Sequence, residues 1–167
     1  MTAMAASPSW RRARLSPALA LLALLPLLAE RKVPLVAPST GAMVLHQPVK
    51  RQIFNVRSSY QREAKRAVEH LVTVGISRIA VVHVDDTFGQ DALAGTLDGL
   101  KATNTQALGI LKFDRAKPDY STLIPELAKL DPQAIVWIGS GTAVTDGIKA
   151  LRAAGANAQI ITLSNNA

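Results

Sequence analysis

Arg78-Ile-Ala-Val-Val-His-Val-Asp-Asp-Thr-Phe-Gly-Gln-Asp91 is the stretch of sequence that decides the fold. Its apolar, β-branched run at 79–84 is typical of a strand buried on both faces of a parallel sheet. A polar turn at 85–89 follows, and leucines then recur at helical spacing. A buried strand, a tight turn and an amphipathic helix form the first half of a βαβ unit. Ligands of open α/β sheets bind just past the carboxyl ends of such strands, so function is expected at the acidic turn 85–89.

The same order of apolar run, polar turn and helical stripe recurs along the chain. The helix after the first stretch is expected over about 90–102, with Leu93, Leu97 and Leu100 on its apolar face. Further strands are predicted at 33–37, 52–56, 106–113, 134–138 and 159–163. Further helices begin at Ser59 and near Tyr120 and Val144, and end before Gly75, Asp131 and Gly155. This alternation predicts an α/β fold with a doubly wound, Rossmann-like parallel sheet.

Composition excludes several kinds of site. The chain of 167 residues is long enough for one domain with a core, and it contains no cysteine, which rules out disulfides and thiolate chemistry. The net charge is +7, but residues 1–32 carry five basic residues and one acidic residue, which accounts for +4 of it. The remaining 14 basic and 11 acidic residues are dispersed without interleaved aromatic side chains. We therefore predict no nucleic-acid partner.

The N-terminal 29 residues have two interpretations. A basic cluster at 10–14 precedes a leucine- and alanine-rich run at 15–29, which is the pattern of a secretory signal peptide with Ala29 at a cleavage point. That interpretation implies a periplasmic or other extracytoplasmic location. Alternatively, 18–31 is a core-facing helix that leads into the strand at 33–37. The run is too short, and too interrupted by proline, to cross a bilayer as a helix.

Enzymatic signatures are weak. The aspartates of the turn 85–86 are interpreted as turn and capping residues rather than a Mg²⁺ site, and His83 as a packed, hydrogen-bonded histidine. Ser140 does not fit the G-x-S-x-G pattern of a nucleophile elbow, because Ile138 and Thr142 occupy the positions of its two glycines. The glycines at 139 and 141 begin like a dinucleotide fingerprint, but Val144 occupies the position of its third glycine. We predict a protein that is not an enzyme and has no metal or cofactor, with a Rossmann-type nucleotide-binding enzyme domain as the alternative.

Three strand-end turns, at 37–41, 85–89 and 139–142, carry a family resemblance. Together with the segments 32–41, 53–57, 79–89 and 134–155, they resemble the leucine/isoleucine/valine-binding family of extracytoplasmic solute receptors for ABC transporters, from about Leu25 onward. The resemblance implies a two-lobed, cleft-closing receptor of the type I periplasmic-binding fold. It also implies a small-molecule ligand, an amino acid or related small carboxylate, and a membrane permease as partner. A ligand-sensing domain of a receptor or regulator would use the same fold.

The resemblance also assigns a ligand site. It implies that Ser39 and Thr40, good helix N-cap residues, hold the ligand carboxylate together with helix N–H groups. Phe88 stands where many members have a cleft-lining tyrosine. The segment after the last strand, at 163–166, lacks the acidic residue that often holds the ligand ammonium, which makes a carboxylate ligand without the amine an open alternative. The implied ligand-binding residues are Ala37, Ser39, Thr40, Phe88, Gly139, Ser140 and Ser164.

Length is the main departure from the family. Members have roughly two domains' worth of chain, about twice this length. The resemblance therefore implies an incomplete receptor with three parts. Residues 1–29 are signal-like or outside the family pattern, 30–57 are a remnant of the first lobe, and 58–167 are most of the second lobe.

Overall fold

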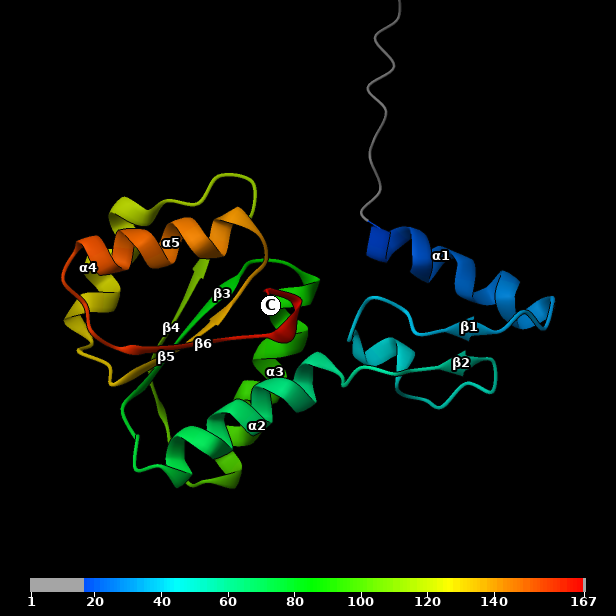
Figure 1. Cartoon of the computed structure of the whole chain (residues 1–167), viewed down its shortest axis with the longest axis horizontal. Helices are drawn as coiled ribbons and strands as arrows, with labels where there is room; N and C mark the ends of the chain where they lie inside the picture. The colour runs from blue at the N-terminus through cyan, green and yellow to red at the C-terminus, as the bar shows by residue number, and fades with distance from the viewer. Residues whose placement is uncertain (1–16, 167) are drawn as a thin grey trace, which may run out of the picture.

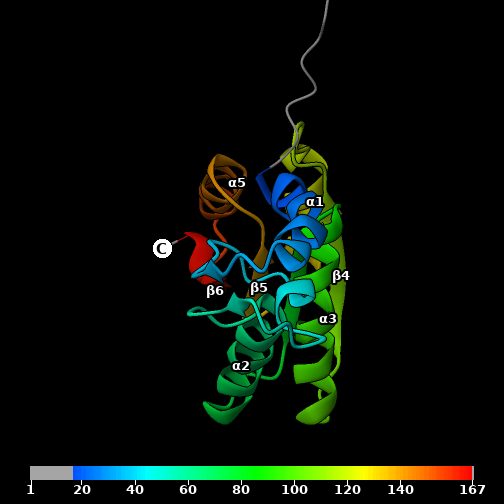
Figure 2. The same ribbon diagram turned by 90° about the vertical axis from the view of Figure 1, so that its right-hand side faces the viewer.

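A computed structural model of the chain describes residues 17–166 (Figure 1). Its larger part is a four-stranded, wholly parallel sheet with strand order β4-β3-β5-β6. The strands are β3 (Ile79–Val84), β4 (Ala107–Phe113), β5 (Ala134–Ile138) and β6 (Gln159–Thr162). In Figure 2, β4 and β6 lie at opposite edges of this sheet. The predicted α/β class and parallel sheet are confirmed.

Helices cover both faces of the sheet. One face carries α2 (Tyr60–Thr73) and α3 (Thr87–Ala102), and the other carries α4 (Tyr120–Lys129) and α5 (Thr142–Ala153) (Figure 1). Side chains of β3 alternate between the two sides, so that Val81 packs with α2 and α3 while Val82 packs with α4 and α5. All six residues of β3 and all five of β5 are buried. This two-sided burial explains the unbroken apolar runs in the sequence.

The helix ends follow the expected capping chemistry. Ser59 caps α2, because its hydroxyl oxygen accepts a hydrogen bond from Arg62 N at 3.3 Å. Gly75 and Gly155 follow α2 and α5 with φ angles of +87° and +83°, a backbone conformation that glycine adopts without strain. His83 is buried, and its Nδ1 lies 2.9 Å from Val84 O, as expected for a packed histidine.

The helix after the acidic turn starts earlier than predicted. It begins at Thr87 rather than near residue 90, because Asp86 is its N-cap and Oδ1 of this residue accepts from Gly89 N at 2.9 Å. Phe88 and Gly89 are therefore helical residues, and the turn itself is Asp85-Asp86. The expectation that Leu97 lies on the apolar face is also wrong, since this side chain is 42% exposed. The buried face of α3 is instead made largely of small residues that let α2 approach closely.

The N-terminal unit, residues 17–57, is built on a smaller scale. It contains α1 (Pro17–Glu30), a two-stranded parallel sheet of β1 (Leu35–Val36) and β2 (Ile53–Phe54), and the 3-10 helix η1 (Met43–Leu45). It lies beside the four-stranded sheet and joins it through the segment before α2 (Figure 1). The strands predicted at 33–37 and 52–56 are thus only two residues long. An apolar run forms a long strand only where neighbouring strands and helices continue its hydrogen bonding and burial.

The first described helix agrees with the helical interpretation of 18–31 in its extent. Of its side chains, Leu25 is buried, whereas Leu24 and Leu27 are about half exposed. The basic cluster at 10–14 lies outside the described residues. Within 17–166, each helix is too short or too polar to cross a membrane.

Candidate ligand site at the carboxyl edge of the sheet

The carboxyl ends of β3 and β5 form the topological switch point of the sheet, because the chain continues to β4 on one side and to β6 on the other. These strands are neighbours in the sheet, yet β3 leads into α3 on one face and β5 leads into α5 on the other (Figure 1). The two connections therefore diverge. In open α/β sheets such a divergence forms the crevice in which ligands bind, and we refer to this position as the crevice. The residues that follow these strands are Asp85 and Asp86 on one side and Gly139 and Ser140 on the other.

Arg115, from the loop after β4, reaches across this crevice. Its Nε and Nη2 lie 2.8 and 2.6 Å from Asp86 Oδ2, and its Nη1 donates to Ser140 Oγ at 2.5 Å. Its Cζ also lies 5.6 Å from the centre of the Phe88 ring. One guanidinium group therefore contacts the ends of both strands and the first turn of α3.

An aromatic pair connects Phe88 to the N-terminal unit. The rings of Phe88 and Tyr60 meet edge to face, with centroids 4.8 Å apart. Tyr60 N donates to Gly41 O at 2.8 Å, and a Cβ atom on Gly41 would lie 2.7 Å from Ser58 O. Glycine is thus required for the close approach of the turn 37–41 to the start of α2. A continuous set of contacts runs from this turn through Tyr60 and Phe88 to Arg115.

Ser39 and Thr40 do not cap a helix, contrary to the prediction. The next helix is η1, whose N-cap is Ala42 and has no side-chain hydrogen bond. Thr40 Oγ1 instead accepts from Ala42 N at 3.3 Å, and Ser39 is exposed. Ala37 has a φ of +50°, and its N–H donates to Phe54 O of the neighbouring strand. The turn is therefore shaped by β1–β2 pairing and a local hydroxyl contact, without an α-helix N-terminus behind it.

The turn after β5 is held by the C-terminal segment. Gly139 O accepts from Asn165 Nδ2 at 3.2 Å and from Asn166 Nδ2 at 3.0 Å, both in the 3-10 helix η2 (Ser164–Asn166). A Cβ atom on Gly139 would lie 2.7 Å from Val144 and 3.0 Å from Phe113, so the turn packs directly on the core. These contacts hold Ser140 in place beside Arg115.

Ser164 contacts residues on both sides of the junction between the N-terminal unit and α2. Its hydroxyl is within 3.0 Å of both carboxylate oxygens of Glu63, and Arg57 Nη2 donates to it at 2.5 Å. Arg57 also pairs with Glu63 at 3.3 Å and lies over the Tyr60 ring. This network connects the segment before α2 with the segment after β6.

Charges around the edge are largely paired. Lys112 hydrogen-bonds to Asp85 at 2.9 Å and, through this bond and its charge, lowers the pKa of Asp85. Hydrogen bonds from Ser121 and Thr122 lower the pKa of Asp119, which caps α4. In the described range 17–166, the acidic residues and histidines form no cluster of three with metal-binding geometry.

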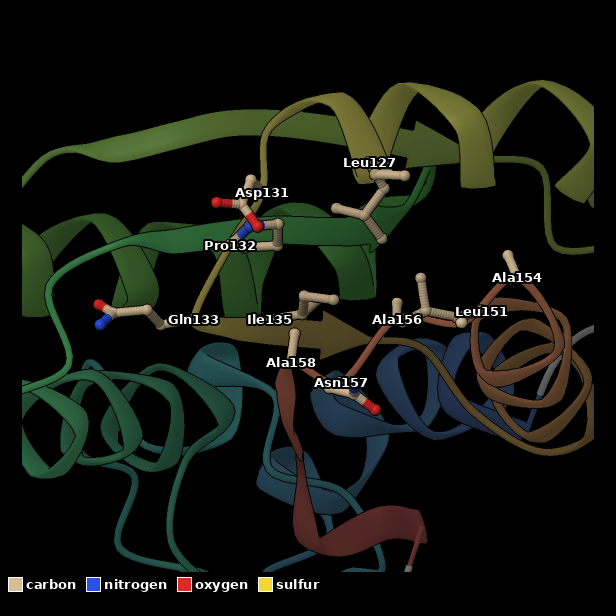
Figure 3. A pocket seen from close by; sticks show the side chains of 12 residues that line it. Leu127, Asp131, Pro132, Gln133, Ile135, Leu151, Ala154, Ala156, Asn157 and Ala158 are labelled. Atoms are coloured by element: carbon tan, nitrogen blue, oxygen red, sulfur yellow. The ribbon is translucent and has the colours of Figure 1, made fainter.

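Two surface hollows lie elsewhere. Figure 3 shows one at the amino-terminal edge of the sheet, where Leu127 of α4, Ile135 of β5 and Leu151 of α5 form an apolar floor. The other lies between the N-terminal unit and α2, and includes His46, Arg57 and Asp98. Neither hollow is lined by a predicted ligand-binding residue. The crevice above β3 and β5 is the location that fold topology favours, and we give it more weight because its polar side chains converge there.

The sequence comparison decides the family. A family model described as "Periplasmic binding protein" matches residues 15–166, nearly the whole chain. The chain belongs to this periplasmic binding protein family. The resemblance predicted from the strand-end turns is therefore confirmed, and the fold is of the type I periplasmic-binding class.

Solved structures of this family agree with the assignment. The chain is similar to a substrate-binding periplasmic protein from Ralstonia solanacearum, with 29% identity and a TM-score of 0.78 over 91% of this chain and 43% of that one. It also resembles a leucine binding protein from Thermotoga maritima, with 18% identity and a TM-score of 0.74 over 86% and 41% of the two chains. A solute binding protein from R. palustris in complex with benzoate is 15% identical, with a TM-score of 0.75 over 85% and 40%.

These proteins are binding proteins, and the chain spans about two fifths of their length. The two matches below 25% identity show the fold alone. No curated protein matches the sequence significantly.

Three contributors to the edge were missed in the sequence. No role in a site was assigned to Arg115, Tyr60 or Glu63 from the sequence. No local pattern marks these contacts, because Arg115 and Ser140 are 25 residues apart along the chain and Glu63 and Ser164 are 101 residues apart. The one available signal was topological: parallel strands end at a common edge, so the loop after β4 had to lie beside the turns after β3 and β5.

Proposed function

We propose that the chain provides ligand-binding elements of a solute receptor for amino acids or related small carboxylates, serving an ABC importer. Membership of the periplasmic binding protein family supports this proposal. So does the description of one similar structure as a leucine binding protein and of another as a benzoate complex. We further propose an extracytoplasmic location, a membrane permease as partner and a role without catalysis.

One observation carries the proposal. The turn 37–41, Tyr60, Phe88, Arg115 and Ser140 form one connected set of residues at the crevice. It joins the N-terminal unit to the ends of β3 and β5. A ligand bound there would contact both parts of the chain at once, as a receptor that closes around its ligand requires.

We assign proposed roles within this set. Ser39 and Thr40 would hold a ligand carboxylate, with Ala37 shaping their turn. Phe88 would supply an apolar wall, and Gly139 and Ser140 would border the crevice. Since the Ser164 hydroxyl is engaged by Glu63 and Arg57, we propose that Ser164 acts mainly by holding the two parts in register.

Thermal unfolding of the full chain with added ligands tests this function. The panel contains branched-chain amino acids, aromatic acids and nucleotides. A ligand at 100 times its dissociation constant adds about 2.7 kcal/mol of stability, which shifts the melting midpoint visibly. Thr40→Val and Phe88→Ala should weaken the response to the active acid, whereas Leu108→Ala, exposed on β4, should not. A response to nucleotides alone would favour a Rossmann-type enzyme domain and overturn the proposal.

A further inference from the structure

We propose that Arg115 makes the crevice selective for small dicarboxylic acids, by binding a second carboxylate distant from the one held at the turn 37–41. This inference rests on the proposed function and specifies its ligand class. A guanidinium group has five N–H donors; on Arg115, Nε is hydrogen-bonded to Asp86 and Nη1 to Ser140, while Nη2 forms an ion pair with Asp86. Among the described residues, one N–H on each of Nη1 and Nη2 is left for a ligand.

The guanidinium group is already oriented. Asp86 holds it through Nε and Nη2, and Asp86 is itself held by its capping bond to Gly89 N. The ring of Phe88 lies beneath the group, and Ser140 holds its third nitrogen. The Arg115 side chain nevertheless stays 42% exposed, so it is held firmly without being enclosed. An arginine constrained in this way loses little side-chain freedom when it binds a ligand.

The remaining donors favour an anion over an ammonium group. Both oxygens of Asp86 have partners, since Oδ1 accepts from Gly89 N and Oδ2 accepts from Arg115. Asp85 is paired with Lys112. An ammonium group at this position would therefore compete with existing cations for occupied carboxylates. A carboxylate instead matches the two free N–H groups, one on each terminal nitrogen, in the bidentate geometry that arginine favours.

The groups that lie between the two polar ends suit a short molecule with an acid at each end. From the turn 37–41, the path to Arg115 crosses only two rings, Tyr60 and Phe88, which are 4.8 Å apart. Phe88 lies in turn 5.6 Å from Arg115 Cζ. The rings offer an apolar wall between two polar ends. A short aliphatic or benzene dicarboxylic acid has the same order of groups.

Titration calorimetry of the full chain with matched acids tests the inference. Each pair differs only in the second carboxylate: glutarate against pentanoate, and terephthalate against 4-methylbenzoate. The dicarboxylate should bind about tenfold more tightly than its partner, as expected for one added charge-assisted hydrogen-bonded pair. Arg115→Gln should remove most of that preference, because it lowers the affinity for the dicarboxylate far more than the affinity for the monocarboxylate.

Two further variants separate the possible causes. Arg115→Lys retains the charge but loses the planar fork, so it should keep only part of the preference. Lys117→Gln removes an exposed positive charge from the same loop and should keep all of it. Far-UV circular dichroism checks that each variant is folded. If Arg115→Gln does not fold, the preference of Arg115→Lys for the dicarboxylate tests the role of Arg115.

The outcomes distinguish this inference from the proposed function. Equal binding of mono- and dicarboxylates by the unaltered chain, or an equal loss of both in Arg115→Gln, overturns the role of Arg115 alone. If the unaltered chain binds neither these acids nor the amino acids, the receptor function is overturned and the inference with it.

Discussion

The two sheets of this molecule start from the same sequence signal and differ sharply in burial. The runs at 33–37 and 79–84 are both short, apolar and followed by polar turns. In the four-stranded sheet every residue of β3 is buried, whereas in the two-stranded sheet Val36 is 65% and Phe54 53% exposed. The difference shows that such a run predicts that a strand is present, while neighbouring strands and covering helices decide its length and its contribution to stability.

Substitution of one aromatic residue in each sheet should give the largest difference. Trp137 of β5 is fully buried, and α5 packs so closely on it that a Cβ atom on Gly147 would lie within contact of its ring. Trp137→Ala should lower the free energy of unfolding by about 3–5 kcal/mol. Phe54→Ala should cost about 1 kcal/mol or less, because much of the side chain already contacts water.

Urea unfolding followed by far-UV circular dichroism measures both changes. Circular dichroism is the suitable probe because Trp137→Ala removes a fluorescent residue. Comparable losses in the two variants would mean that the two-stranded sheet contributes as much to the free energy of unfolding as the larger sheet, despite its greater exposure.

Gly95→Ala sharpens the comparison at the helices that cover the larger sheet. A Cβ atom at this position would lie 2.1 Å from Gln61 O and 2.3 Å from Gln61 Cα, both in the backbone of α2. Backbone atoms cannot move aside as a flexible side chain can, so α2 and α3 must separate. We expect a loss of about 1–3 kcal/mol, even though alanine favours helix formation.

Asp98→Ala, an exposed substitution in the same helix, is the matched control and should change the stability little. Chemical unfolding of both variants gives the result. If Gly95→Ala were neutral or stabilising, the close packing of α2 on α3 would not limit stability in this half of the molecule.

The paired aspartates after β3 give a smaller and more local contrast. Asp86 caps α3 and holds Arg115, whereas Asp85 makes one exposed ion pair with Lys112. Asp86→Ala should cost about 1 kcal/mol through the lost cap. Asp85→Ala should cost clearly less, as exposed ion pairs contribute little to stability.

Thermal unfolding at neutral pH distinguishes these two substitutions. Asp86→Asn retains a capping oxygen but removes the charge beside Arg115, so it should recover most of the stability lost in Asp86→Ala. Equal effects of the alanine variants would remove the distinction between the two positions.

The smallest expected effect concerns the contact between the N-terminal unit and α2–α3. Burial lowers the pKa of His46 below its ordinary value of 6.5, the charge of Arg62 lowers it further, and Asp91 opposes both. The folded chain therefore binds this proton less readily than the unfolded chain. Stability is unaffected well above pH 6.5 and decreases as the pH falls through 6.5 toward the lowered value.

Melting midpoints at about pH 7.5 and pH 5.5 test this titration. His46→Gln should reduce the pH dependence, whereas His70→Gln, on the exposed side of α2, should leave it nearly as it was. An unchanged pH profile in His46→Gln would show that this contact does not respond to protonation.

Much of the fold followed from local patterns. The run at 79–84, the cap at Ser59 and the stops at Gly75 and Gly155 depend on burial period and backbone preference, which act over a few residues. The strand-end turns were sufficient to identify the family. The start of α3 was misplaced, because a single capping oxygen, on Asp86, outweighed the leucine period in setting the boundary.

The sequence by itself determined the alternation of strands and helices, the parallel sheet and the edge at which a ligand is expected. Only the tertiary structure decided which side chains meet there. Arg115 lies 29 residues from Asp86 and 25 from Ser140 along the chain, yet it touches both. The short strands of the N-terminal unit were decided in the same way, by what lies around them. Periodicity reflects the neighbours of a residue along one element, whereas a site assembled from three loops depends on how separate elements pack, which no single stretch of sequence encodes.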